Sequence, residues 1–418
     1  MSGPRNAVDA GDVLDRVRRH QSPRVALTST FAGQGAVEVG AGGCRVRLSD
    51  GREMLDFGSY AVTLLGHRHP DVVAAVREQL DVMPTASRTL ANPVTAHAAA
   101  TVSAYLDHAL PRVYFGLNGA DVVEVALKLA RLTTGRRRVV AVDGAFHGKS
   151  LGALALTHSA HFRDGLEDYL ADTAHVAGDD PDAVGRELAR GDVAALVVEP
   201  VQGENGAVPI APEVLRAWCA SAQEHDVVVI ADEIQCGLRR CGERSVALSA
   251  GLPVDAVLLG KPLGGGVVPL SAGLFSERLY RPLADNPFLH SATFGGHPLS
   301  CAALPAALNA IEALAPRGQA IEAQMSRGLA DLRQAHPAAI TAVRGRGLLW
   351  GIDLATPALA GEVLLGLAGA GLLVSPCLSR ASTLRLLPPL VAGDGEVADA
   401  LKMLDTTIAA AEHTLEGA

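Results

Sequence analysis

Short apolar segments alternate with helix-like segments between about residues 60 and 310 of this chain. The strand-like segments are RVYF (112–115), VVAVD (139–143), VAALVVEP (193–200), VVVIADE (227–233), AVLLG (256–260) and PLSAGLF (269–275). Residues 120–133 and 212–225, which lie between them, have the apolar periodicity of helices. This alternation predicts an α/β fold with a mostly parallel sheet flanked by helices. Its ligand is expected beyond the carboxyl ends of the strands.

The pattern changes at both ends of the chain. Residues 44–57 alternate apolar and polar positions around Asp50-Gly51, which predicts a β-hairpin. After residue 336, strand-like segments and helices over 358–370 and 395–415 predict a smaller α+β unit, against which the hairpin is expected to pack. We therefore divide the chain into a small-domain segment 1–60, a large domain 61–312 and a C-terminal small domain 313–418.

Composition excludes several classes of protein. The net charge is −9, and the basic clusters at 16–20 and 135–140 are short enough to be solvated helix ends or loops, so no nucleic-acid partner is expected. We find no N-terminal signal pattern and no apolar run near the ~20 residues of a membrane span, so no membrane partner is expected. Six scattered cysteines with one C-x₄-C spacing predict no metal site, and a cytoplasmic enzyme with reduced thiols is expected.

Two strand ends carry the side chains that indicate chemistry. Asp232 ends one apolar run, and Lys261 follows another, with two residues between it and three consecutive glycines. A lysine amine can form a Schiff base with an aldehyde, and an acid can keep a pyridinium nitrogen protonated so that the ring accepts electrons. Each residue alone has an ordinary explanation, a loop or phosphate contact for Lys261 and a solvated turn for Asp232. Together they indicate an enzyme that uses pyridoxal 5′-phosphate.

A phosphate site is predicted at the start of the helix over 120–133. Asn118, Gly119 and Ala120 stand where free backbone N–H groups and the helix dipole favour an anion. The alternative is ordinary capping, because Asn is a good N-cap and Asp121 suits a first turn.

Residues that could contact the cofactor ring follow two other strands. Phe146 and His147 come directly after a strand, where Phe146 could stack on a heteroaromatic ring, although an aromatic residue there is more often part of the core. Asp232 and Ile234 share a face of an extended segment, so Ile234 could cover the ring that Asp232 contacts. Gln235 could hydrogen-bond the 3-oxygen of the ring.

Nine motifs resemble those of the class III aminotransferases in order and spacing, over roughly residues 30–410. That family has the pyridoxal-phosphate-dependent fold type I and includes acetylornithine, ornithine and 4-aminobutyrate aminotransferases. The motifs are LDFGSYAVTLLGHRHP, LNGADVVEVALKLAR, AFHGKSLGALALT, EPVQGENG, ADEIQCGLRRCG, GKPLGGG, HSATFGGHPLSCAA, VRGRGLLWGIDL and LRLLPPL.

The resemblance implies roles for five more residues. Thr293 would reach the phosphate of a neighbouring subunit, which implies a homodimer or a dimer of dimers. Arg385 would bind a substrate carboxylate, Glu204 would pair with it when that carboxylate is absent, and Tyr60 matches a substrate-pocket tyrosine. Lys149 stands where the ornithine and acetylornithine enzymes use an arginine for a carboxylate, and a lysine lacks the bidentate fork.

The expected reaction moves an amino group from an amine, of a terminal or diamine type, to a 2-oxo acid such as 2-oxoglutarate or pyruvate. Lys261 would carry the cofactor and then move a proton as general base and acid, with ping-pong kinetics. Two alternatives stay open. One is a racemase or aminomutase on the same scaffold, which needs no second substrate, and the other is a non-catalytic protein of this fold.

Overall fold

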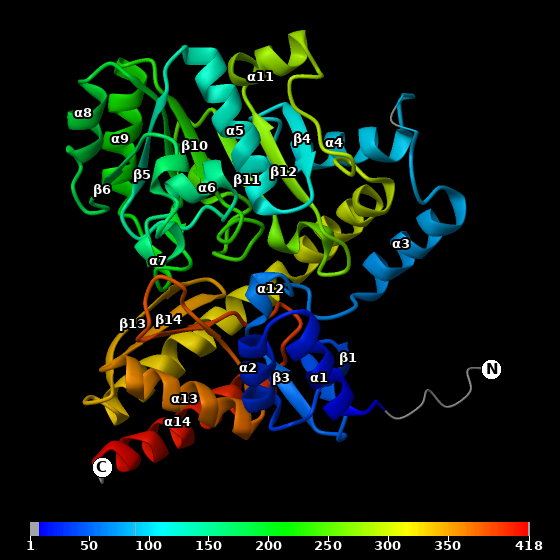
Figure 1. Cartoon of the computed structure of the whole chain (residues 1–418), viewed down its shortest axis with the longest axis vertical. Coiled ribbons are helices and arrows are strands. Elements are labelled where there is room, and N and C mark those ends of the chain that lie inside the picture. The colour runs from blue at the N-terminus through cyan, green and yellow to red at the C-terminus, as the bar shows by residue number, and fades with distance from the viewer. Residues whose placement is uncertain (1–7, 88, 417–418) are drawn as a thin grey trace.

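The computed structural model describes residues 8–87 and 89–416 (Figure 1). Residues 1–7 and 417–418 of the predicted small-domain segments lie outside this range. A seven-stranded sheet forms the upper half in Figure 1, and two four-stranded sheets lie in the lower half with both chain ends.

The large sheet has the strand order β4-β12-β11-β10-β7-β5-β6, in which β12 alone runs antiparallel to its neighbours. All six predicted segments form strands, and β6 is a seventh that the sequence pattern did not reveal. The strands are β4 (Arg112–Gly116), β5 (Arg138–Val142), β6 (Thr173–Val176), β7 (Val193–Val198), β10 (Val228–Asp232), β11 (Ala256–Leu259) and β12 (Ser271–Phe275). The prediction of a mostly parallel sheet is confirmed.

Helices cover both faces of this sheet because alternate strand residues point to opposite sides. In β10, Val229 and Ala231 belong to the core cluster that includes α9, α4 and α12, whereas Val228 and Ile230 belong to the cluster under α5 and α11. The helices are α3 (Pro70–Val82), α4 (Pro93–Tyr105), α5 (Gly119–Thr134), α6 (Leu151–Leu156), α7 (Ala160–Arg163), α8 (Ala183–Leu188), α9 (Pro212–Glu224), α10 (Val246–Ser249) and α11 (Glu277–Asp285). Burial on both faces explains why these strands are apolar throughout.

Residues from both ends of the chain build the two smaller sheets. One has the order β1-β2-β3-β15, from β1 (Glu38–Gly42), β2 (Arg45–Leu48), β3 (Glu53–Asp56) and β15 (Leu372–Leu373). The predicted hairpin is therefore β2-β3, and its pairing with β15 confirms that it joins the C-terminal unit. The other sheet has the order β13-β14-β17-β16, from β13 (Ile340–Arg346), β14 (Leu349–Leu354), β17 (Thr383–Leu386) and β16 (Ser375–Pro376).

Five helices complete this half or lead into it: α1 (Ala10–His20), α2 (Pro23–Gly33), α12 (Pro298–Ala335), α13 (Pro357–Ala370) and α14 (Asp394–Glu416). Helix α12 runs without a break through position 312, and the domain boundaries at 60 and 312 stay predictions. Within the described part of the chain, α12 is also the one helix whose length and composition would suit a membrane span. It packs against α3, α4 and α14, and a core helix of this kind gives the same signal.

Candidate active site

A cavity of about 550 Å³ lies at the carboxyl edge of the large sheet. Besides Val62, its walls come from the segments that follow β4, β5, β7, β10 and β11, and from residues 266–270, which precede the antiparallel β12. All these segments meet at one edge because an antiparallel strand begins where its neighbours end. The cavity is where an open α/β sheet is expected to bind its ligand.

Nine of the fourteen predicted site residues line this cavity: Asn118, Gly119, Ala120, Phe146, His147, Asp232, Ile234, Gln235 and Lys261. The other five do not. Of these, Glu204 and Arg385 contact Gln235 or each other, and Lys149 contacts Phe146. Tyr60 is 71% exposed and Thr293 is also exposed in the single chain.

The cavity wall after β4 is a capped helix start. The Asn118 Oδ1 atom accepts a hydrogen bond from the Asp121 amide (3.2 Å), and the Asp121 carboxylate accepts from the Leu117 amide (2.8 Å). The side chain of Asn118 therefore caps helix α5, as the alternative to a phosphate contact predicts. The first N–H groups of α5, at Gly119 and Ala120, have no intrahelical acceptors and lie at the cavity, so the site can bind an anion there.

Gly119 also permits two cavity walls to approach closely. A Cβ atom at this position would lie 2.8 Å from Ile234 Cδ1, closer than side-chain carbons pack. A larger residue at 119 would force the Ile234 side chain to move away from the helix start.

Asp232 forms a buried pair with His147. The His147 Nδ1 atom lies 2.7 Å from Asp232 Oδ2, and the Ile234 amide donates to Asp232 Oδ1 over 3.1 Å. Burial alone lowers the pKa of His147, but the hydrogen bond and charge of Asp232 outweigh it and the pKa is raised. The pair can therefore present a carboxylate that is held in one orientation. Within the described residues, His147 Nε2 has no hydrogen-bond partner.

Lys261 directly follows Gly260, the residue after β11, and has a left-handed backbone with φ 43°. Burial lowers the pKa of its amine; the nearby Arg385 acts in the same direction, and Glu204 opposes it. A lowered pKa leaves more of the amine neutral and nucleophilic near pH 7.

Glu204 and Arg385 form a buried ion pair behind Gln235. The exposed fraction of Arg385 is 1% and that of Glu204 is 5%. Arg385 Nη1 also donates to Gln235 Oε1 over 3.4 Å, and Glu204 Oε2 accepts from the Leu378 amide over 3.1 Å. In the described chain, Gln235 Nε2 and Arg385 Nε have no hydrogen-bond partners, and of these two residues Gln235 lines the cavity, where it can donate to a ligand.

Lys149 lies on two aromatic rings at the side of the cavity. Its Nζ atom is 4.2 Å from the ring centroid of Phe162 and 5.9 Å from that of Phe146, within the range of cation–π interactions. The two phenylalanine rings contact each other edge to face at 6.1 Å.

Glu199 is a cavity residue to which sequence reasoning assigns no role. It follows β7, is buried, and accepts a hydrogen bond from the Phe146 amide over 3.0 Å. Burial raises its pKa to about 7, against the opposing charge of His147. The available signal was its place directly after a buried strand, the same signal that marks Asp232.

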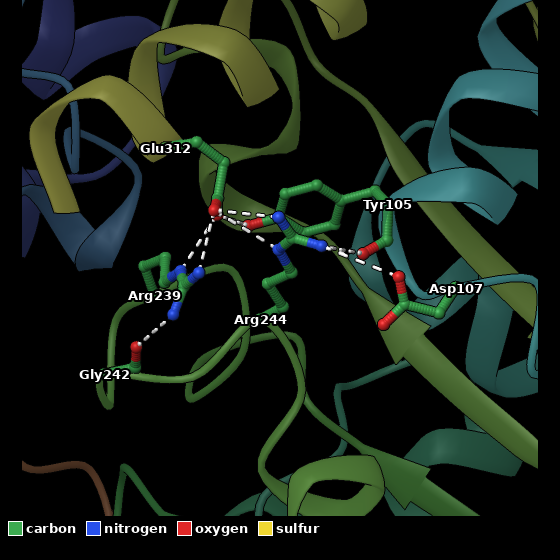
Figure 2. A network of polar contacts seen from close by, with 6 residues as sticks. All are labelled: Tyr105, Asp107, Arg239, Gly242, Arg244 and Glu312. Carbon is green, nitrogen blue, oxygen red and sulfur yellow. Dashed lines mark hydrogen bonds and ion pairs between the residues drawn. The ribbon is translucent and has the colours of Figure 1, made fainter.

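The loop after Gln235 is anchored to helix α12 by a charged network (Figure 2). Glu312 accepts hydrogen bonds from Tyr105 Oη (2.8 Å), from Arg239 Nε (2.8 Å) and Nη2 (2.7 Å), and from Arg244 Nε (3.2 Å) and Nη2 (3.1 Å). Arg244 also lies 3.8 Å from Asp107. These bonds hold the loop that carries Gln235 against the long helix.

A family model described as aminotransferase class-III matches residues 34–408. The chain belongs to the class-III aminotransferases. The putrescine aminotransferase of Pectobacterium atrosepticum is 35% identical over 408 residues, which cover 94% of this chain and 87% of that protein.

Solved structures agree with this family. The ornithine aminotransferase of Toxoplasma gondii has 29% identity and a TM-score of 0.89, with 98% of this chain and 96% of that chain covered. A pyridoxal-phosphate-bound amine transaminase from an uncultivated Pseudomonas species has 26% identity and a TM-score of 0.82, with 90% and 95% covered.

The predicted family, the fold type I architecture and the aminotransferase activity are thus confirmed, and the cofactor of this class-III aminotransferase is pyridoxal 5′-phosphate. The cavity fits that cofactor. It joins an amine, a buried carboxylate, an unpaired amide donor at Gln235 and an anion-binding helix start.

Proposed function

We propose that this aminotransferase takes the amino group from the terminal amine of a diamine or diamine-type amino acid and delivers it to a 2-oxo acid such as 2-oxoglutarate or pyruvate. Its family supports the amine and 2-oxo acid classes, and the relatives named for putrescine and ornithine support the terminal amine. The observation that carries the proposal is one cavity in which Lys261 and the Asp232–His147 pair stand at neighbouring strand ends.

Bound pyridoxal phosphate supplies an electron sink for the substrate carbon. Lys261 is the residue that would hold the cofactor covalently and, once displaced by the amine, move a proton to and from that carbon. Asp232, oriented by His147, would keep the ring nitrogen protonated. Gln235 Nε2 is the donor available for the 3-oxygen.

The remaining cofactor contacts are proposed at the two sides and the phosphate end of the ring. Phe146 and Ile234 would contact its faces. The phosphate would be held by the helix start formed by Asn118, Gly119 and Ala120, with the backbone amides as donors.

Arg385 and Glu204 are proposed to exchange partners between the two substrates. A donor that brings no carboxylate leaves Arg385 in need of an anion, because an unpaired buried charge is costly, and Glu204 supplies it. The 2-oxo acid carboxylate would replace Glu204 and bind Arg385 through two hydrogen bonds. Tyr60 and Lys149 are proposed to contact the substrate further out.

The assembly is proposed to be a soluble cytoplasmic homodimer or a dimer of dimers. Thr293 would donate to the phosphate in the partner's cavity, since it does not line the cavity of its own chain. Each active site would then need both subunits.

A two-step absorbance experiment tests the proposed function. Adding putrescine or ornithine to the purified holoenzyme should remove the absorbance of the bound cofactor, and adding 2-oxoglutarate or pyruvate should restore it. Conversion of the amine without any oxo acid would instead support the racemase or aminomutase alternative. If no amine changes the spectrum, the result would support the alternative of a non-catalytic protein with this fold.

A further inference from the structure

Asp56 collects hydrogen bonds from one short segment of the chain. It is the last residue of β3, its exposed fraction is 1%, and it does not line the cavity. Its carboxylate accepts from the Gly58 amide (2.9 Å), Ser59 Oγ (2.5 Å) and Thr63 Oγ1 (3.5 Å), and it faces His67 Nε2 at 2.7 Å.

The segment that Asp56 contacts has an unfavourable backbone. Ser59, Tyr60 and Ala61 have φ values of 42°, 52° and 65°, the longest run of left-handed non-glycine residues in the described chain. Residues with a Cβ atom avoid this conformation because it brings Cβ against the neighbouring carbonyl oxygen. Three in succession persist only where the surroundings impose them.

This left-handed turn lies against the cofactor cavity. Val62, the next residue, lines the cavity. The Val62 carbonyl oxygen and Thr63 Cα lie 3.5 and 3.8 Å from where a Cβ atom of Gly266 would stand, so the turn packs on the glycine loop after Lys261. The Ala61 carbonyl of the turn accepts a hydrogen bond from Arg240 Nη2 over 3.4 Å.

We propose that Asp56 is a positioning residue of the amine site: its carboxylate imposes the left-handed turn Ser59–Ala61, which carries Tyr60 and sets Val62 in the cavity wall. This rests on the proposed function, because the turn can affect amine use only if the cavity is the transamination site. Asp56 itself contacts no reacting group. Its effect passes through the backbone of residues 58–62.

The test uses Asp56→Asn in the holoenzyme, with Asp50→Asn as the matched control. Asparagine keeps the size of Asp56 and one acceptor oxygen, but its amide nitrogen cannot accept from Ser59 or His67. Asp50 lies in the same hairpin and makes only an exposed pair with Arg52. D56N should lower kcat/KM for the amine half-reaction roughly 10- to 100-fold through KM, as small displacements in a site do. D50N should leave it unchanged.

Hydrogen exchange on the apo protein gives a readout that does not depend on the cofactor. The amides of Ala61 and Val62 donate to the carbonyls of Gly58 and Ser59 within the turn. Both should exchange faster in D56N and at the wild-type rate in D50N. Wild-type protein that uses no amine would overturn the proposed function, whereas the exchange rates test the turn in either case.

A rescue variant separates positioning from general damage. Glycine adopts the left-handed conformation readily, so Ala61→Gly in the D56N background should restore most of the lost amine kcat/KM and slow the exchange again. D56N that matches wild type in both measurements would overturn the proposal, as would a double variant that recovers nothing. If D56N does not fold, Ser59→Ala removes one hydrogen bond to Asp56, and the same two measurements decide.

Discussion

Lys261 combines a reactive side chain with an unfavourable backbone. Among the described residues that line the cavity, it is the one non-glycine residue with a left-handed φ. Such a conformation costs on the order of 1–3 kcal/mol and tends to persist where function requires it. The glycines on either side, Gly260 and Gly264–Gly266, let the chain bend sharply enough to present the amine at the strand end.

Lys261→Ala should abolish turnover and the absorbance of the bound cofactor, because the amine that holds it is lost. The chain has only four lysines, Lys128, Lys149, Lys261 and Lys402, which makes the assignment easy to check. Borohydride reduction followed by peptide mapping should label Lys261 in wild type and no lysine in the variant. A label on Lys149 would show that Lys149, and not Lys261, binds the cofactor.

Asp232→Ala should retain part of the cofactor through the phosphate contacts but lower kcat by roughly 10²–10³-fold, the usual loss for one electrostatic group in a site. Asp255→Ala is the control, since Asp255 precedes β11 at the opposite edge of the same sheet and bonds the Val229 amide. Cofactor content and single-turnover rates should separate the two variants. A normal kcat in D232A would exclude the proposed contact with the ring nitrogen.

The sequence alone predicted the site residues that end or follow an apolar run, but not the residues whose role depends on burial and contacts in the folded protein. Lys261 and Asp232 could be predicted because an apolar run ends at each of them. Glu199 has the same local signal, but its contact with Phe146 depends on the pairing of β5 with β7, and its burial depends on the packing around them. Asp56 has no sequence signal, because its role comes from four donors that the fold brings to it.

At the scale of elements, helix α12 holds the loop after β10 through an ion pair. Arg239 in the loop after β10 has a left-handed φ of 67°, and its guanidinium binds Glu312 of α12 through two nitrogens. Burial raises the pKa of Glu312, but Arg239, Tyr105 and Arg244 outweigh burial and lower the pKa to about 2. The carboxylate therefore stabilises the fold at neutral pH.

Glu312→Gln should lower Tm by roughly 2–6 °C at pH 7, since several charge-assisted hydrogen bonds weaken. Glu277→Gln, which breaks the exposed pair with Arg112, should change Tm little. Because the pKa of Glu312 is lower in the folded than in the unfolded protein, its carboxylate stabilises the fold fully at a pH above the unfolded pKa of about 4.5. This stabilisation is lost as the pH falls toward the folded pKa of about 2. The Tm difference between wild type and E312Q should therefore shrink over that range, and a constant difference would contradict this account.

The Glu204–Arg385 pair joins the turn between the short strands β8 (Val201–Gln202) and β9 (Val208–Pro209) to strand β17. Arg385→Ala should impair the half-reaction with the oxo acid more than that with the amine. The reason is that Arg385 is proposed to bind the carboxylate of the oxo acid. Glu204→Ala should do the converse and strengthen oxo-acid binding, since Arg385 is left free. Single-turnover measurements of each half-reaction decide, and equal losses in both would leave the two residues a structural pair.

At the scale of the whole molecule, the sequence predicted the large sheet, the small α+β unit and the packing of the hairpin against that unit, but not strand β6 or the register of the hairpin on its partner strand. Strand β6 was missed because TAHV is short and only half apolar. The pairing of β3 with β15 brings together residues more than 300 positions apart, and hydrophobic periodicity gives no register for such a pair.

The dimer prediction concerns residues 286–297, which carry Thr293. Phe288 is 90% exposed in the single chain, and Leu289 and Phe294 of the same segment are 38% and 52% exposed, so several apolar side chains of this segment lack cover in the single chain. Sedimentation should find a dimer or larger assembly, which Phe288→Asp should weaken. Thr293→Ala should keep the dimer but reduce cofactor affinity about 10-fold or more, the loss of one hydrogen bond to a charged group. An active monomer would contradict both expectations.

Helix α12 has a mechanical consequence. It is a single rod of 38 residues that begins beside the large sheet and ends beside the small ones, and it contains Pro305 and Pro316. A proline removes one hydrogen bond from the helix ladder, so bending stiffness is lowest at these two points. Glu312 stands between them and is clamped to the loop that carries Gln235. We expect any flexing of the rod to be transmitted as a shift of that loop, so that strain in one half of the molecule reaches the other as a change in pocket shape.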